Sequence, residues 1–147
     1  MTKRSCGRVS ADAGCAGYQL LFSALISLHG APDTIYRAWR AARFEAVTSR
    51  MQRDEIRRAS RYPKLQAILQ PAQVGVMINN LQRAAVLERL PIEVEADDPN
   101  DSFLLAMALA GDADYLVTGD RRAGLLQRRH IERTRIVTPI AFCAEVL

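Results

Sequence analysis

The sequence predicts an α/β fold in which helices cover both faces of a parallel β-sheet. Strand-like apolar runs alternate with helix-like segments along the chain, and this alternation is typical of parallel sheets. The chain has 147 residues, of which 49% are hydrophobic, so a single domain over residues 1–147 is expected to bury a sizeable core. No internal repeat or low-complexity linker divides it.

Helices are expected over most of the first two-thirds of the chain. They are predicted over residues 20–28, 31–44, 50–62, 63–70 and 71–88. The second of them has Pro32 near its start, a position that proline favours. Its apolar face is predicted to consist of Ile35, Ala38, Trp39 and Ala42. The third is rich in charge and is predicted to end near Pro63.

Strands are expected at four places, over residues 44–49, 90–96, 115–120 and 135–139. The first of these alternates briefly between polar and apolar residues and ends on a helix cap at Thr48 or Ser49. A helix over 97–113 begins with acidic and proline residues, continues with an apolar body and is predicted to end at Gly111. A short helix over 140–146 follows the last strand.

Composition excludes several classes of protein. The net charge is +4 and comes almost entirely from arginine, which suits a nucleic-acid or acidic partner or simply a solvated surface. The three cysteines form no C-x-x-C pair and there are two histidines, so neither a zinc site nor a disulfide framework is expected. No apolar run is long enough to span a bilayer, and residues 1–14 lack the apolar centre of a secretory signal. We therefore expect a cytoplasmic protein.

Three acids fall where an open parallel sheet gathers functional groups, beyond the C-terminal ends of its strands. Asp120 follows the apolar run 115–117 after a Thr-Gly turn, Asp101 begins the helix after residues 90–96, and Glu55 lies one helix beyond the first predicted strand. Carboxylates that converge resist ionisation unless a cation is present. Oxygen ligands favour Mg²⁺ or Mn²⁺, which can activate water and stabilise charge on a phosphodiester.

Each acid also has a simpler interpretation. Asp101 is compatible with a helix N-cap, and Glu55 with a solvated helix residue paired with a neighbour such as Arg58. Asp114 is expected to shape the turn into its strand. Asp120 is the hardest to explain by packing, because a Gly-Asp pair at the end of a buried strand contributes little to a core.

A longer motif joins these acids. The stretch over residues 97–126, DDPNDSFLLAMALAGDADYLVTGDRRAGLL, resembles the C-terminal signature of PIN-domain nucleases, in the branch of toxin components of toxin–antitoxin pairs. The similarity covers residues 20–147 and continues through LFSALISLHGAP, AWRAARFEAVTS, DEIRRASRYPKL and RTRIVTPIAF. The D-x-x-D helix start followed by A-D-x-L-V-T-G-D is much more specific than any single acid.

The resemblance implies a PIN-like three-layer α/β/α sandwich with a central parallel sheet, and Mg²⁺- or Mn²⁺-dependent hydrolysis of RNA. By matching motifs, Glu55, Asp101 and Asp120 are the catalytic and metal-binding residues, and Thr118 is the hydroxyl residue that often accompanies them. Arginines stand where members often carry a further acid. The implied partners are RNA and a cognate small antitoxin, with no membrane; a homodimer is left open.

One acid of the family pattern is missing. Members open with an apolar strand that ends in L-D-T-N, and the corresponding residues 16–19 here are A-G-Y-Q. The first catalytic aspartate therefore falls at Gly17, which has no side chain to bind a metal. Asp12 lies five residues too early to replace it. The nuclease activity of this chain is expected to be strongly reduced or absent.

The genetic code suggests an origin for this loss. The codons for residues 12–19, D-A-G-C-A-G-Y-Q, can be written so that a reading one base later gives M-R-V-V-L-D-T-N. We hypothesise that residues 1–19 are read out of frame and that a single-base insertion or deletion restores the frame before residues 20–147. Small residues and glycines would then replace a Val-Val-Leu strand, which predicts a loose first strand.

Three interpretations of function remain open. The leading one is a PIN-type ribonuclease in which arginines such as Arg121, Arg122, Arg128 and Arg129 hold the RNA backbone, although a solvated arginine face is equally compatible. The second is a non-catalytic PIN relic that binds an antitoxin or another protein. The third is an unrelated α/β ligand-binding domain; the absence of G-x-G-x-x-G and P-loop patterns argues against a nucleotide cofactor in it.

Overall fold

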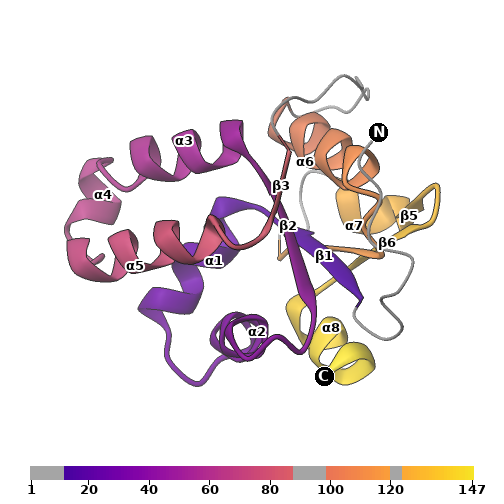
Figure 1. Cartoon of the computed structure of the whole chain (residues 1–147), viewed down its shortest axis with the longest axis horizontal. Helices are drawn as coiled ribbons and strands as arrows, with labels where there is room; N and C mark the ends of the chain where they lie inside the picture. Colours follow the sequence, from indigo (N-terminus) through magenta and orange to yellow (C-terminus); the bar gives the residue numbers. More distant parts are fainter. Residues whose placement is uncertain (1–11, 88–98, 120–123) are drawn as a thin grey trace.

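The computed structural model of the chain describes residues 12–87, 99–119 and 124–147 (Figure 1). In chain order its elements are β1 (Ala13–Ala16), α1 (Tyr18–Ile26), α2 (Ala31–Arg40), β2 (Glu45–Ser49), α3 (Arg50–Ala59), α4 (Pro63–Gln66), α5 (Pro71–Leu81), β3 (Ala85–Leu87), α6 (Pro99–Ala110), β4 (Tyr115–Val117), α7 (Leu125–Arg128), β5 (His130–Ile131), β6 (Thr134–Val137) and α8 (Pro139–Val146).

The strands form one mixed sheet in the order β3-β2-β1-β4-β6-β5. Every neighbouring pair is parallel except β5 and β6, which are antiparallel. Helix α6 packs on one face of the sheet, where Leu105 and Met107 are fully buried against Cys15 and Leu116. Helices α1, α2 and α8 cover the other face. The predicted three-layer α/β/α fold with a mostly parallel central sheet is confirmed.

A second group of helices stands beside these layers. Helices α3, α4 and α5 extend to the left of the sheet in Figure 1. Ile56 of α3 and Met77 of α5 are completely buried together with Phe22 of α1 and Tyr36 of α2. This shared apolar cluster fixes α3, and with it Glu55, against the start of α1.

The central strand is β1, although its sequence is only Ala-Gly-Cys-Ala. It pairs with β2 on one side and β4 on the other, and Ala13 and Cys15 are buried. Its small side chains leave an apolar cavity of about 40 Å³ beneath α1 and α2, lined among others by Gly14 and Ala16. The strand is thus present, with the space that larger side chains would occupy left open beside it.

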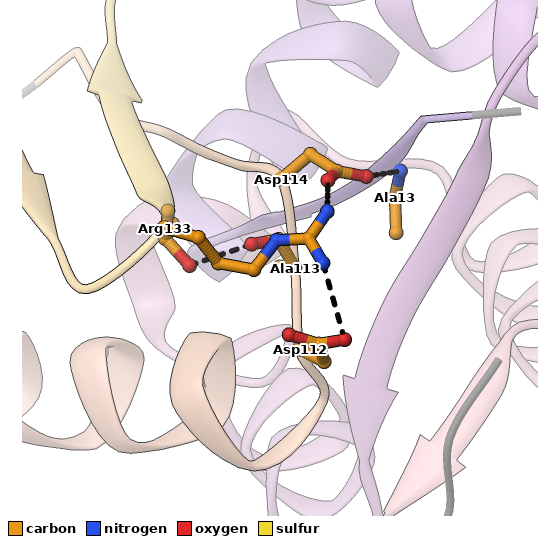
Figure 2. A network of polar contacts seen from close by, with 6 residues as sticks. Ala13, Asp112, Ala113, Asp114 and Arg133 are labelled. Atoms are coloured by element: carbon orange, nitrogen blue, oxygen red, sulfur yellow. Dashed lines mark hydrogen bonds and ion pairs between the residues drawn. The ribbon is translucent and has the colours of Figure 1, made fainter.

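A polar network ties the amino end of β1 to the neighbouring strands (Figure 2). The carboxylate of Asp114 accepts the Ala13 amide hydrogen at 2.8 Å, and the Asp114 amide donates to the Ala13 carbonyl at 2.7 Å. Arg133 pairs with the carboxylates of both Asp114 and Asp112. The sequence predicts that Asp114 shapes the turn before β4; the contacts of its side chain run instead to β1 and to Arg133, so Asp114 anchors the start of β1.

Three predicted helix ends are wrong. The helix predicted over 63–70 ends as α4 at Gln66. Helix α2 ends at Arg40, and Ala42 lies beyond it with a φ of 61°, exposed and not on the apolar face. The Arg43 amide donates to the Ala38 carbonyl at 2.9 Å, so the chain closes the helix through a left-handed residue that is not glycine. The helix predicted over 71–88 ends at Leu81, and residues 85–87 instead form β3, because the edge of β2 supplies partners for them.

Helix α6 ends at Ala110, directly before Gly111, as predicted, but the residue with the left-handed backbone is not the glycine. The left-handed residue is Asp112, with a φ of 51°, whose next neighbour Ala113 donates its amide to the Ala108 carbonyl at 2.9 Å. A Cβ atom on Gly111 would lie 2.4 Å from Cγ1 of Val47. Glycine is required here because α6 crosses β2 too closely for a side chain. The strand predicted over 90–96 lies outside the described residues.

Candidate active site at the carboxyl edge of the sheet

The carboxyl ends of the central strands bring three chain segments to one edge. Ala16 at the end of β1 is paired with Val117 at the end of β4, and Ser49 at the end of β2 is paired with Leu87. Gly17 and Thr118 directly follow the first pair, so they leave the sheet side by side. This is the edge at which open parallel sheets place functional groups.

Gly17 stands at the end of the central strand, where the family pattern places its first aspartate. It is the N-cap of α1, with φ −74° and ψ 166°, a conformation open to any residue. A Cβ atom here would lie 3.3 Å from Cδ1 of Leu104 and 3.2 Å from Oε1 of Gln19. Leu104 follows Asp101 by three residues, so the two share one face of α6. A side chain at position 17 would therefore meet the helix face that carries Asp101.

Asp101 lies in the first turn of α6 and is 3% exposed. It is the third residue of the helix, so the interpretation of Asp101 as the N-cap is wrong. The positive end of the helix dipole favours a carboxylate there. Burial of a charged acid is costly without compensation, and a nearby cation is one form of compensation.

Glu55 is half-buried on α3. Burial raises the pKa of its carboxyl group, and the charge of Arg58 partly lowers it. The carboxylate in turn contributes to the raised pKa of Tyr18, after the larger effect of burial. Since Tyr18 directly follows Gly17, Glu55 acts on the same strand end. Glu55 is thus only partly exposed to solvent, and the interaction expected with Arg58 is present.

A buried polar network that the sequence analysis missed supports this edge. Gln52 is 1% exposed; its Nε2 donates to the Ala16 carbonyl at 2.6 Å, and its Oε1 accepts from the Thr48 hydroxyl at 2.6 Å. The backbone amide of Gln52 donates to the Ser49 hydroxyl at 3.1 Å, so Ser49 is the N-cap of α3. Ser49 was one of the two predicted caps. The S-x-x-Q spacing from Ser49 to Gln52 is the sequence signal that could have indicated this corner. Gln52 fixes the backbone just before Gly17.

The remaining predicted groups are only partly described. Thr118 is buried at the end of β4, and its amide donates to the Val137 carbonyl at 2.9 Å. Asp120, Arg121 and Arg122 lie outside the described residues. Arg128 and Arg129 are exposed at the end of α7, where the Arg129 carbonyl accepts from the middle of β6.

Two of the predicted ligands suit a divalent cation. Glu55 and Asp101 are oxygen donors of the kind that Mg²⁺ and Mn²⁺ prefer. Within residues 12–87, 99–119 and 124–147, however, no group of three or more His, Cys, Asp or Glu side chains is arranged to hold a metal ion. Gly17 contributes no ligand where the family pattern has one. The described residues therefore supply an incomplete metal site.

The comparison with known families identifies the class. The model of the PIN domain matches residues 19–122, and the chain belongs to the PIN-domain family, whose members are generally nucleases and typically depend on divalent metals. The chain matches no curated protein and no solved structure. In the part of the chain that the structure describes, no helix is long and apolar enough to cross a membrane.

Proposed function

We propose that this chain carries the scaffold of a metal-dependent ribonuclease, the toxin of a type II toxin–antitoxin pair, and that its activity is impaired at Gly17. One observation carries the proposal. Gly17 occupies the carboxyl end of the central strand, and a side chain there would contact the α6 face of Asp101. An aspartate at this position would join the two acids at the edge, whereas glycine leaves the set incomplete.

The site residues of this proposal are Glu55, Asp101 and Asp120. They would hold Mg²⁺ or Mn²⁺, which when bound supplies an activated water and neutralises charge on the phosphodiester. The chain's own contribution is positioning. Asp101 is placed at this edge by the first turn of α6. The raised pKa of Glu55 makes a nearby cation favourable, since a cation stabilises the ionised carboxylate.

We propose a shift of reading frame as the origin of the glycine. The family match begins at residue 19, which is the last residue of the segment 12–19 for which a one-base shift restores M-R-V-V-L-D-T-N. The cavity lined by Gly14 and Ala16 supports larger residues at these positions, where the shifted reading has valine and leucine. Sequencing the gene around the Leu20 codon tests this, and codons that do not give Asp-Thr-Asn in the shifted frame would refute it.

The activity test compares the chain with its Gly17→Asp and Gly17→Asn variants. Asparagine has nearly the same shape and also caps a helix, but it lacks the charge that binds a cation. We expect Mn²⁺-dependent RNA cleavage to rise at least tenfold in Gly17→Asp and to stay at background in the other two. Adding Asp101→Asn to the aspartate variant should abolish the gain. Equal activity of all three proteins would contradict the proposal.

A cognate small antitoxin belongs to the same proposal as the protein partner. Exposed apolar side chains support a protein contact; Leu28 is 65% exposed and Ile140 is 74% exposed. Binding needs no acid at position 17, so the chain and its Gly17→Asp variant should both co-purify with the product of the neighbouring reading frame. If neither protein retains this product, the proposal of a cognate antitoxin is wrong.

A further inference from the structure

A second recess lies at the opposite edge of the sheet from Gly17. It is a groove of about 500 Å³, formed where the chain leaves α2 and enters β2, with the end of α5 as its other wall. Its chemistry is set by Trp39, Arg40, Phe44, Glu45, Asn80 and Arg83. The volume is within the range of small-ligand sites, and the proposed active site does not use it.

Tyr36 holds two of the groove's polar side chains in place. The guanidinium of Arg40 lies 5.7 Å from the centre of the Tyr36 ring, and Nδ2 of Asn80 donates to the Tyr36 hydroxyl at 2.9 Å. Tyr36 itself is buried in the core. The groove is therefore built on a rigid support from two helices that are distant in sequence, which favours binding because little ordering is needed.

The wall of the groove combines two kinds of surface. Trp39 provides aromatic surface, continued by alanines over the buried ring of Phe44, while Arg40 and Arg83 are exposed and positively charged. A ligand that matches both has a flat apolar ring and an anionic group attached to it. A single nucleotide has this combination.

We propose that this groove binds one nucleotide of a single-stranded RNA, with its phosphate at Arg40 and Arg83 and its base against the aromatic wall. The choice of RNA as the source of the nucleotide rests on the proposed function. The match between the groove and a nucleotide is independent of that function. Arginine contacts to phosphate and base contacts with aromatic rings are the usual means of binding single strands. The groove would hold RNA apart from the cleavage edge, across the length of β2.

Trp39 makes the test direct, because it is the single tryptophan of the chain and lines the groove. A pentameric oligoribonucleotide is titrated into the full chain in EDTA, so that metal-dependent cleavage plays no part, and Trp39 emission is recorded. We expect a saturable change. The Arg40→Gln/Arg83→Gln variant should bind at least tenfold more weakly. The slope of log affinity against log salt should become shallower by about 0.7, because the contact to one phosphate is lost.

The matched control is Arg57→Gln/Arg61→Gln, which removes the same charge from exposed positions outside the groove and should bind as the parent does. No saturable change, or equal losses in both double variants, would overturn the proposal. If a free nucleoside monophosphate binds as tightly as the pentamer, RNA is not the ligand. If an acidic peptide binds more tightly than the pentamer, the groove is a peptide site and the proposal of a nucleotide is wrong. If the Gly17→Asp variant does not cleave RNA, the proposed function is refuted, but the fluorescence titration of the groove still stands as a separate test.

Discussion

Replacing Gly14 with alanine is expected to stabilise the protein. Gly14 lies in the middle of the central strand and lines the apolar cavity. A Cβ atom there would lie 3.7 Å from Cε1 of Phe142 and 3.8 Å from Cε2 of Phe44, which are ordinary van der Waals distances. The added methyl group therefore fills space without displacing either ring.

The size of the gain follows from two terms. Alanine reduces the conformational freedom of the unfolded chain, which contributes about 0.4–1 kcal/mol where the native backbone accepts it. Burial of one more methyl group contributes about 0.8 kcal/mol. The free energy of unfolding should rise by roughly 1–2 kcal/mol. For a domain of this size, each kcal/mol should raise the melting temperature by about 2–4 °C.

Gly111→Ala is the matched control, since it makes the same chemical change at a site without space. Its Cβ would lie 2.4 Å from Cγ1 of Val47 and 3.2 Å from the Met107 carbonyl oxygen. Valine is stiff within a strand, so the helix must shift, at a cost of about 1–3 kcal/mol. Both variants are measured by thermal and urea unfolding followed by circular dichroism. Shifts of the same sign, or destabilisation by Gly14→Ala, would refute the packing of β1 described above.

Three further changes test the supports of the candidate site. Gln52→Leu removes the donor to the Ala16 carbonyl in a buried place and should cost about 1–3 kcal/mol in urea unfolding; an unchanged midpoint would contradict its role. Burial raises the pKa of Glu55, so the folded state keeps this proton to higher pH and stability falls as pH rises through that range. The melting temperature of Glu55→Gln should equal that of the parent below about pH 4 and exceed it increasingly toward neutrality, whereas a constant difference would argue against the shift. Asp114→Ala removes the acceptor of the Ala13 amide and should cost about 1–3 kcal/mol, with faster hydrogen exchange at that amide; unchanged exchange would exclude the anchor.

The elements that could be predicted from the sequence are those with a strong local pattern. Helix α6 combines an acidic start with an apolar body, and β4 and β6 are short apolar runs, so each was predicted within a few residues. The place of Gly17 at the end of a strand could also be predicted, because it follows from the match of neighbouring residues to the family and needs no knowledge of distant contacts. Gly17 does stand at a strand end.

The features decided by tertiary structure depend on partners that are far away in the chain. Ala-Gly-Cys-Ala has little strand preference of its own, yet it becomes β1 because β2 and β4 supply hydrogen bonds on both sides and helices cover both faces. Residues 85–87 become β3 because β2 has an edge to pair with. The role of Gln52 arises from an oxygen on β1, and the need for Gly111 from a side chain on β2. Local patterns determine which elements form easily, whereas hydrogen-bond partners and steric limits between distant segments determine how the weak ones are completed.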